Sequence, residues 1–94
     1  MLFRSAHVAA VFAQTPKAQF LWGSLLLARG QPLQALKPLE LVAARQPNHL
    51  WAHINLGNAY LSLGRRMEAA RQFKSALALD PGNVEAQQGL KAAF

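Results

Sequence analysis

The feature that most constrains this chain is an internal repeat with a period of 34 residues. A shift by that length superposes Gly23 on Gly57 and Gly30 on Gly64. The other identical pairs are Ala18 with Ala52, Leu27 with Leu61, Ala35 with Ala69, Ala44 with Ala78 and Pro47 with Pro81. A repeat of this length indicates a supersecondary unit that recurs along the chain and stacks on its own copies.

Each 34-residue unit is predicted to form two antiparallel helices. In the second unit, apolar residues recur at steps of three and four over residues 53–63 and again over 67–79, which is typical of amphipathic helices. Gly64 marks the end of the first helix, and the turn at residues 80–83 contains the proline that ends the second. Turns as short as these favour antiparallel neighbours.

Glycine inside a predicted helix points to close packing. It costs about 1 kcal/mol relative to alanine there, so Gly57 needs a compensating contact. We expect Gly57 to let the two helices of its unit approach closely, opposite Ala69 and Ala76. Phe73 is expected to fill the adjacent space, and Gly23 has the corresponding place in the first unit.

The second unit resembles a tetratricopeptide repeat. The resemblance lies in the run from Trp51 to Tyr60 and in Ala69, Phe73, Ala76, Asp80 and Pro81. His53 stands where the family usually carries tryptophan, and in the first unit Trp22 stands where leucine is usual. The resemblance implies an all-α fold in which antiparallel helix pairs stack as a short right-handed α-solenoid, with about five to six helices.

The period divides the chain into a single domain of four parts. These are residues 1–15, an N-terminal extension; 16–49, the first repeat; 50–83, the second; and 84–94, a capping helix or the first helix of a third repeat. Residues 1–15 match no register of the pattern. We expect an extra helix from Leu2 to Ala13 that packs on the open end of the stack, and Arg4 and His7 argue against a secretory signal there.

Pro38 conflicts with the helix that the period predicts after Pro32. A proline in a helix interior removes one backbone hydrogen bond and costs about 3 kcal/mol if the helix stays straight. The sequence therefore predicts either a bend at Pro38 or a helix that starts late, near that residue.

The sequence carries no recognisable catalytic motif. Its four acidic residues are scattered singly: Glu40, Glu68, Asp80 and Glu85. Without a carboxylate pair, a cysteine, a nucleophile motif or a glycine-rich phosphate loop, we expect neither an enzyme nor a cofactor. His49 and His53 have the i, i+4 spacing of metal ligands, but no third ligand is near. A helix start at His49 and a packed ring at His53 are therefore favoured over a metal site.

The net charge of +6 raises the question of an anionic partner. The predicted helices place most cations in turns, at helix C-termini and on second helices. Only Lys17 points toward the concave groove that the family resemblance implies. Aromatic residues do not interleave with these cations as single-stranded nucleic acid requires, so nucleic-acid binding is disfavoured. The longest apolar stretch, residues 20–28, is far shorter than a membrane span.

The family resemblance also implies a concave groove, lined by the first helix of each unit, that takes an extended peptide or a partner helix. The corresponding positions are Lys17, Phe20, Ser24, Leu27 and Ala28 in the first unit and Trp51, Ile54, Asn55, Asn58, Leu61 and Ser62 in the second. Asn55 and Asn58 match amides that hold a peptide backbone or carboxylate in the family. Phe20 stands where a carboxylate clamp has lysine, which favours an apolar over an acidic segment.

Two functions remain open. The first is a non-enzymatic scaffold that binds a peptide segment or helix of a partner protein in the groove. The second is a structural module that associates with its own copies through its open ends. The alternative to an open groove is that Phe20, Trp51 and Ile54 are covered by neighbouring helices or by a second protomer. The high content of Ala, Leu and Arg suggests a bacterial, cytoplasmic chain.

Overall fold

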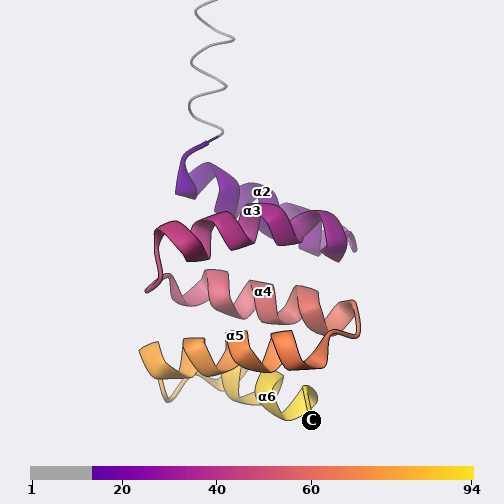
Figure 1. Cartoon of the computed structure of the whole chain (residues 1–94), viewed down its shortest axis with the longest axis vertical. Helices are drawn as coiled ribbons and strands as arrows, with labels where there is room; N and C mark the ends of the chain where they lie inside the picture. The colour runs from indigo at the N-terminus through magenta and orange to yellow at the C-terminus, as the bar shows by residue number, and fades with distance from the viewer. Residues whose placement is uncertain (1–13) are drawn as a thin grey trace, which may run out of the picture.

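The computed structural model describes residues 14–94, so the helix predicted over residues 2–13 lies outside the described residues. The described chain forms a layered stack of helices (Figure 1). In chain order they are α2 (Pro16–Ala28), α3 (Pro32–Arg45), α4 (Leu50–Ser62), α5 (Arg66–Leu79) and α6 (Val84–Ala92). Residues 14–94 include no strand, and the predicted all-α class is confirmed.

The helices begin and end at the signals that the repeat predicts. Thr15 caps α2 because its Oγ1 accepts a hydrogen bond from the backbone N–H of Ala18 at 3.2 Å. Gly30 and Gly64 follow the first helix of each unit with φ angles of 74° and 75°. This left-handed conformation is strained for residues with a Cβ but accessible to glycine. The two units therefore repeat one helix-turn-helix geometry.

The order of packing is that of a solenoid. Helix α2 packs on α3 and α4 on α5, as the antiparallel pairs of the two repeats. Helix α4 contacts both helices of the preceding pair, and α6 contacts α5 and α4 in the same way. Because each new first helix lies against the pair before it, every helix pair buries a second face that it could not bury alone.

The ring of Phe73 on α5 lies between glycines of two other helices. A Cβ built on Gly57 of α4 would lie 2.6 Å from Phe73 Cζ, and a Cβ on Gly89 of α6 would lie closer still. Neither approach is sterically possible for a real Cβ, and Phe73 has no exposed surface. The close approach expected at Gly57 is confirmed, and the same ring also brings α6 into the core.

The first unit repeats this contact with a smaller side chain. A Cβ on Gly23 of α2 would lie 2.7 Å from Cγ of Leu39 on α3. Leu39 occupies the repeat position of Phe73 and is likewise fully buried. The mid-helix glycine of each unit thus admits a bulky residue of the second helix.

Helix α3 runs without interruption from Pro32 through Pro38 to Arg45, so the predicted late start is wrong. Pro32 fits the first turn, where its missing N–H needs no acceptor. Pro38 is buried and lies against Gly23 of α2. Its missing N–H leaves the carbonyl of Gln34 without a helical partner, but Gln34 is exposed and water can satisfy it. The predicted bend at Pro38 stays a prediction.

Tyr60 joins the second unit to the first. Its hydroxyl donates a hydrogen bond of 2.7 Å to Oε1 of Glu40 on α3, and the guanidinium of Arg65 lies 5.0 Å from the centre of its ring. Burial, followed by the hydrogen bond to the Glu40 carboxylate, raises the pKa of Tyr60 from 10.0 to about 12. The protonated hydroxyl is therefore part of the contact between the repeats.

We predict that Gly57→Ala destabilises the fold, although alanine is the better helix former. The added methyl group collides with the buried Phe73 ring, so the free energy of unfolding should fall by about 1–3 kcal/mol in urea titrations. Gly82→Ala is the matched control, because a Cβ there meets only Asp80 Oδ1 at 3.9 Å. Equal or higher stability of Gly57→Ala would contradict the close packing.

Alkaline titration tests the contact of Tyr60, which is the single tyrosine of the sequence and so the only source of tyrosinate absorbance. We predict ionisation near pH 12 in the folded protein. Because folding raises this pKa, the associated stabilisation is complete below pH 10 and is lost as the pH rises to 12. Glu40→Gln should lower the pKa only part of the way, since burial is the larger cause. A midpoint of the tyrosinate titration at pH 10 in the wild-type protein would exclude the buried hydrogen bond of Tyr60 to Glu40.

Candidate functional site

The residues predicted to line the groove differ in how much surface they expose. Those that are exposed are Lys17, Ala28, Trp51 and Ser62. Those that are partly buried are Phe20, Ser24, Leu27, Asn55, Asn58 and Leu61. Ile54 has no exposed surface and belongs to the hydrophobic core, which corrects its placement in the groove. An aliphatic side chain that neighbouring helices can enclose is stabilised there by the removal of its surface from water.

The accessible residues of α4 form one stripe. Trp51, Asn55, Asn58 and Ser62 follow one another at steps of four, three and four, so their side chains share one face of the helix. Trp51 at the start of the stripe is 43% exposed. The repeat places Lys17, Leu21, Ser24 and Ala28 at the same positions of α2. We call these eight residues the first-helix stripe.

Leu21 is a stripe residue that sequence reasoning missed. It is 56% exposed on α2, at the repeat position of Asn55. Leu21 was not singled out from the sequence, whereas Asn55 was identified by its amide. The 34-residue offset between the two residues was the signal that could have found it.

A hydrogen bond connects the two repeats within the stripe. Nδ2 of Asn55 donates to Oγ of Ser24 at 3.0 Å, which ties α4 to α2. Within residues 14–94, the side chain of Asn58 forms no hydrogen bond. The Asn58 amide, with two donors and one carbonyl oxygen, is thus available one turn from the fixed Asn55 and two turns from Trp51 on the same face.

Phe20 and the leucines lie at the edge of the core. The ring of Phe20 packs on that of His49, with centroids 4.6 Å apart and planes tilted by 40°. Leu27 and Leu61 pack against the core cluster from the side. Phe20 is therefore partly covered by the start of α4, in line with the interpretation in which neighbouring helices cover it.

His49 and His53 are engaged in structural contacts. Nδ1 of His49 accepts a hydrogen bond from the backbone N–H of Ala52 at 3.1 Å and so caps α4. Nε2 of His53 lies 2.7 Å from the Pro47 carbonyl oxygen, and its Nδ1 lies 2.8 Å from Oε1 of Gln72. A neutral ring satisfies both contacts if Nε2–H donates to Pro47 and the Gln72 amide is turned to donate to Nδ1. In the described part of the chain, no cluster of three metal-ligating side chains exists.

The described cations lie at the surface, several of them at helix ends. Arg29 follows α2 and Arg45 is the last residue of α3, as predicted. Arg65 donates to both carboxylate oxygens of Glu68, at 2.8 and 2.7 Å, and this pairing lowers the pKa of Glu68. The Nη1 atom of Arg45 donates to the backbone carbonyl of Gln14 at 2.8 Å.

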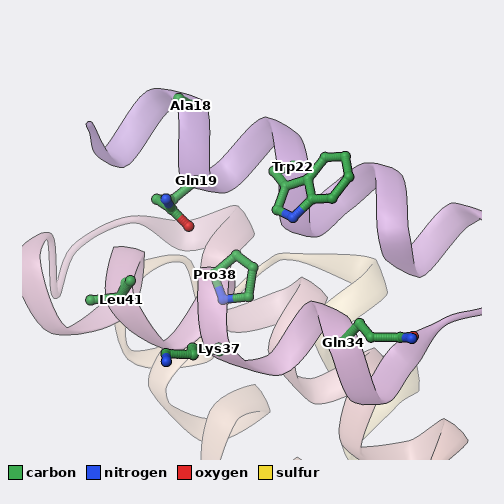
Figure 2. A pocket seen from close by; sticks show the side chains of 7 residues that line it. All are labelled: Ala18, Gln19, Trp22, Gln34, Lys37, Pro38 and Leu41. Carbon is green, nitrogen blue, oxygen red and sulfur yellow. The ribbon is translucent and has the colours of Figure 1, made fainter. Parts of the chain in front are cut away.

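Two hollows lie at the ends of the stack. One, of about 680 Å³, lies between α2 and α3 and is lined by Trp22 with Pro38 and Leu41 among others (Figure 2). The other, of about 540 Å³, is formed by residues of α5, α6 and the C-terminus, with Leu77, Leu90 and Phe94 in its wall. Neither hollow is lined by the first-helix stripe.

Comparison with known families identifies the class of protein. Residues 26–94 match the family model described as "Tetratricopeptide repeat". The chain belongs to the tetratricopeptide repeat family, as its helix pairs and the resemblance of its second unit indicated. Among residues 14–94, no helix is both long and apolar enough to cross a lipid bilayer.

Curated relatives add particular similarities. The chain is 39% identical over 64 residues to a human protein named "FK506-binding protein-like", an alignment that covers 68% of this chain and 18% of that protein. It is 38% identical over 56 residues to a tetratricopeptide repeat and J domain-containing co-chaperone of Fusarium oxysporum, covering 60% of this chain and 11% of the relative. It is 35% identical over 68 residues to human DnaJ homolog subfamily C member 7, an alignment that covers 72% of this chain and 14% of that protein. The chain thus spans less than a fifth of the length of each of these relatives.

We predict that Ser24→Ala lowers the free energy of unfolding by about 1 kcal/mol, because the part-buried Asn55 amide loses its acceptor. Ser62→Ala is the matched control: it is the same substitution on an exposed residue of the stripe, and its effect should stay within about 0.5 kcal/mol. Thermal or urea unfolding measures both. Equal effects of the two substitutions would exclude a stabilising link between the repeats at Ser24.

Proposed function

We propose that this chain is a non-enzymatic protein-interaction module whose first-helix stripe binds a peptide segment or helix of a partner protein. The observation that carries this proposal is that the exposed Trp51 and the Asn58 amide lie on one face of α4, two helical turns apart. Tryptophan contributes a large contact area, and an amide can donate to and accept from a peptide backbone. Such an aromatic and amide pair suits a helix or extended segment in a shallow groove.

The proposed partner segment is apolar rather than acidic. Lys17 is the single cation among the eight stripe residues, and Leu21 and Trp51 are its largest exposed apolar side chains. Phe20, at the position where a carboxylate clamp has lysine, packs on His49. An acidic tail would therefore find little charge to pair with at this surface.

The relatives support a partner that is itself a protein. One of them is by name a co-chaperone with both tetratricopeptide repeats and a J domain, and another is a DnaJ homolog. On the basis of these names, we propose that this chain binds a protein within a chaperone-type assembly. The cytoplasmic location and bacterial origin remain predictions from composition, and the relatives named above are eukaryotic.

Self-association is the second candidate function, favoured by apolar side chains at both ends of the stack. Trp22 on α2 is 52% exposed and Phe94 at the C-terminus is 77% exposed. Sedimentation over a concentration series distinguishes the candidates, since a monomer at all concentrations contradicts self-association as the main role.

We predict that peptides selected from a random library on the wild-type chain bind the stripe. Their Kd should rise at least about tenfold for the Trp51→Ala, Asn58→Ala double variant, because hot-spot aromatic residues dominate such contacts. The matched control is Lys37→Ala, Lys74→Ala, which removes two exposed residues of the second helices. If the peptides bind the stripe variant as tightly as the wild type, or if only the control variant loses binding, the proposed binding at the first-helix stripe is wrong.

A further inference from the structure

The turns inside the two repeats lie along one edge of the stack. Residues 29–33 contain the turn after α2 and the first residues of α3, and residues 63–67 contain the turn after α4 and the first residues of α5. Figure 1 shows both turns on the same side, with the C-terminal end of α6 on that side too. The turns between the repeats, residues 46–49 and 80–83, lie on the opposite side. We call residues 29–33 and 63–67 the turn edge.

A large apolar side chain is exposed at the same place in each half of the turn edge. Leu33 is 65% exposed and Met67 is 76% exposed. The 34-residue period makes them equivalent, and each lies in the first turn of its helix. A single exposed apolar side chain is ordinary in a soluble protein. Two of them at one repeat position give the edge an apolar character that the opposite turns lack, because those turns contain no large apolar residue.

The turn edge is also positively charged. It contains Arg29, Arg65 and Arg66, all exposed, and no acidic residue. Arg65 is paired with Glu68, which follows the edge. Within the described residues, neither the side chain of Arg29 nor that of Arg66 forms a hydrogen bond or an ion pair. The turns on the opposite side contain no lysine or arginine, and Asp80 is their single acidic residue. Cations without a partner therefore lie beside exposed apolar side chains on one edge.

Further cations lie one helical turn behind the apolar side chains. Lys37 follows Leu33 by four residues and Arg71 follows Met67 by four, so each pair shares one face of its helix. Both cations are exposed. The exposed Lys91 lies in the last turn of α6, whose C-terminal end is on the same side of the stack (Figure 1). The combination of an apolar tip with cations around it is thus repeated along the edge.

This combination fits the surface of a bilayer that contains anionic lipids. Apolar side chains can enter the acyl region there, while long basic side chains keep their charges among the headgroups. Each Lys or Arg near such a surface contributes about 1 kcal/mol of attraction. The phosphates of a nucleic acid would pair with the arginines but offer no apolar layer to Leu33 and Met67. An acidic protein would need a separate hollow for each of these two protruding side chains.

We propose that the turn edge binds the surface of a membrane that contains anionic lipids. Leu33 and Met67 enter the interface between headgroups and acyl chains. Arg29 and Arg66 pair with the lipid phosphates. The proposal does not depend on the proposed peptide binding, because no residue of the turn edge belongs to the first-helix stripe. A partner protein bound at the stripe would then be held at the membrane surface.

Co-sedimentation of the intact chain with lipid vesicles tests the proposal. We expect the chain to bind mixed vesicles of phosphatidylcholine and phosphatidylserine and not to bind vesicles of phosphatidylcholine alone. The double variant Leu33→Gln, Met67→Gln should lower the partition coefficient about tenfold, because it removes the apolar contribution without changing the charge. The double variant Arg29→Gln, Arg66→Gln should lower it by at least about tenfold, because two headgroup contacts are lost.

Matched control variants change the same kinds of residue elsewhere. Leu79→Gln, Val84→Gln removes two exposed apolar side chains at the opposite edge. Arg45→Gln, Lys74→Gln lowers the net charge by the same amount at exposed positions outside the turn edge. Both controls should bind within about twofold of the wild type, because charges more than a Debye length from the bilayer are screened.

Three results would overturn the proposal. The first is the absence of binding to the mixed vesicles. The second is an equal loss of binding in the turn-edge variants and their controls, which would show adsorption by net charge alone. The third is binding to soluble polyglutamate in preference to the mixed vesicles, which would indicate an acidic protein as the partner.

An environment-sensitive fluorophore measures the insertion itself. The sequence has no cysteine, so a single label can be attached at Met67→Cys and, as the control, at Val84→Cys on the opposite edge. We expect the emission of the label at position 67 to shift to shorter wavelength on mixed vesicles, and that of the label at position 84 to stay unchanged. A shift at neither position, or an equal shift at both, overturns the proposal.

Discussion

The burial of one aromatic ring between two glycines holds the last three helices of the stack, α4 to α6, together. Phe73 of α5 contacts Gly57 of α4 and Gly89 of α6, so a single side chain unites three helices. Any Cβ at either glycine would displace the ring, and with it the spacing of the helices. The cost of glycine in a helix, about 1 kcal/mol at each position, is offset by the burial of this ring. In the first repeat Leu39 and Gly23 make the equivalent contact.

This close packing determines which residues remain for recognition. Apolar side chains that face a neighbouring helix are buried in the core, and Ile54 is the clearest case. His49 and His53 are likewise occupied, His49 by a helix cap and His53 by two hydrogen bonds. What the core leaves accessible on one face of α4 is the row of Trp51, Asn55, Asn58 and Ser62. These side chains offer an aromatic surface and polar groups that are neutral.

Much of the fold follows from local rules that recur at a fixed period. The positive φ of Gly30 and Gly64 and the cap at Thr15 lie where the sequence predicts them, because each depends only on neighbouring residues. The candidate site is less predictable. Ile54, which was expected in the groove, is buried, and Leu21, for which nothing was expected, is exposed, since hydrophobicity alone does not tell which side of a helix is covered. The late start predicted at Pro38 is also wrong, because α3 is continuous through that residue.

The sequence by itself determined the repeat, the two-helix unit and the places where helices end, because these depend on spacing along the chain. Only the tertiary structure decided which members of the predicted groove are exposed, since exposure depends on which helix lies opposite. It also revealed Gly89 as the second glycine against Phe73, a contact outside the 34-residue register: Lys91, not Gly89, is the repeat equivalent of Gly57. A contact of this kind depends on how two helices pack, so the residue pattern of either helix alone does not predict it.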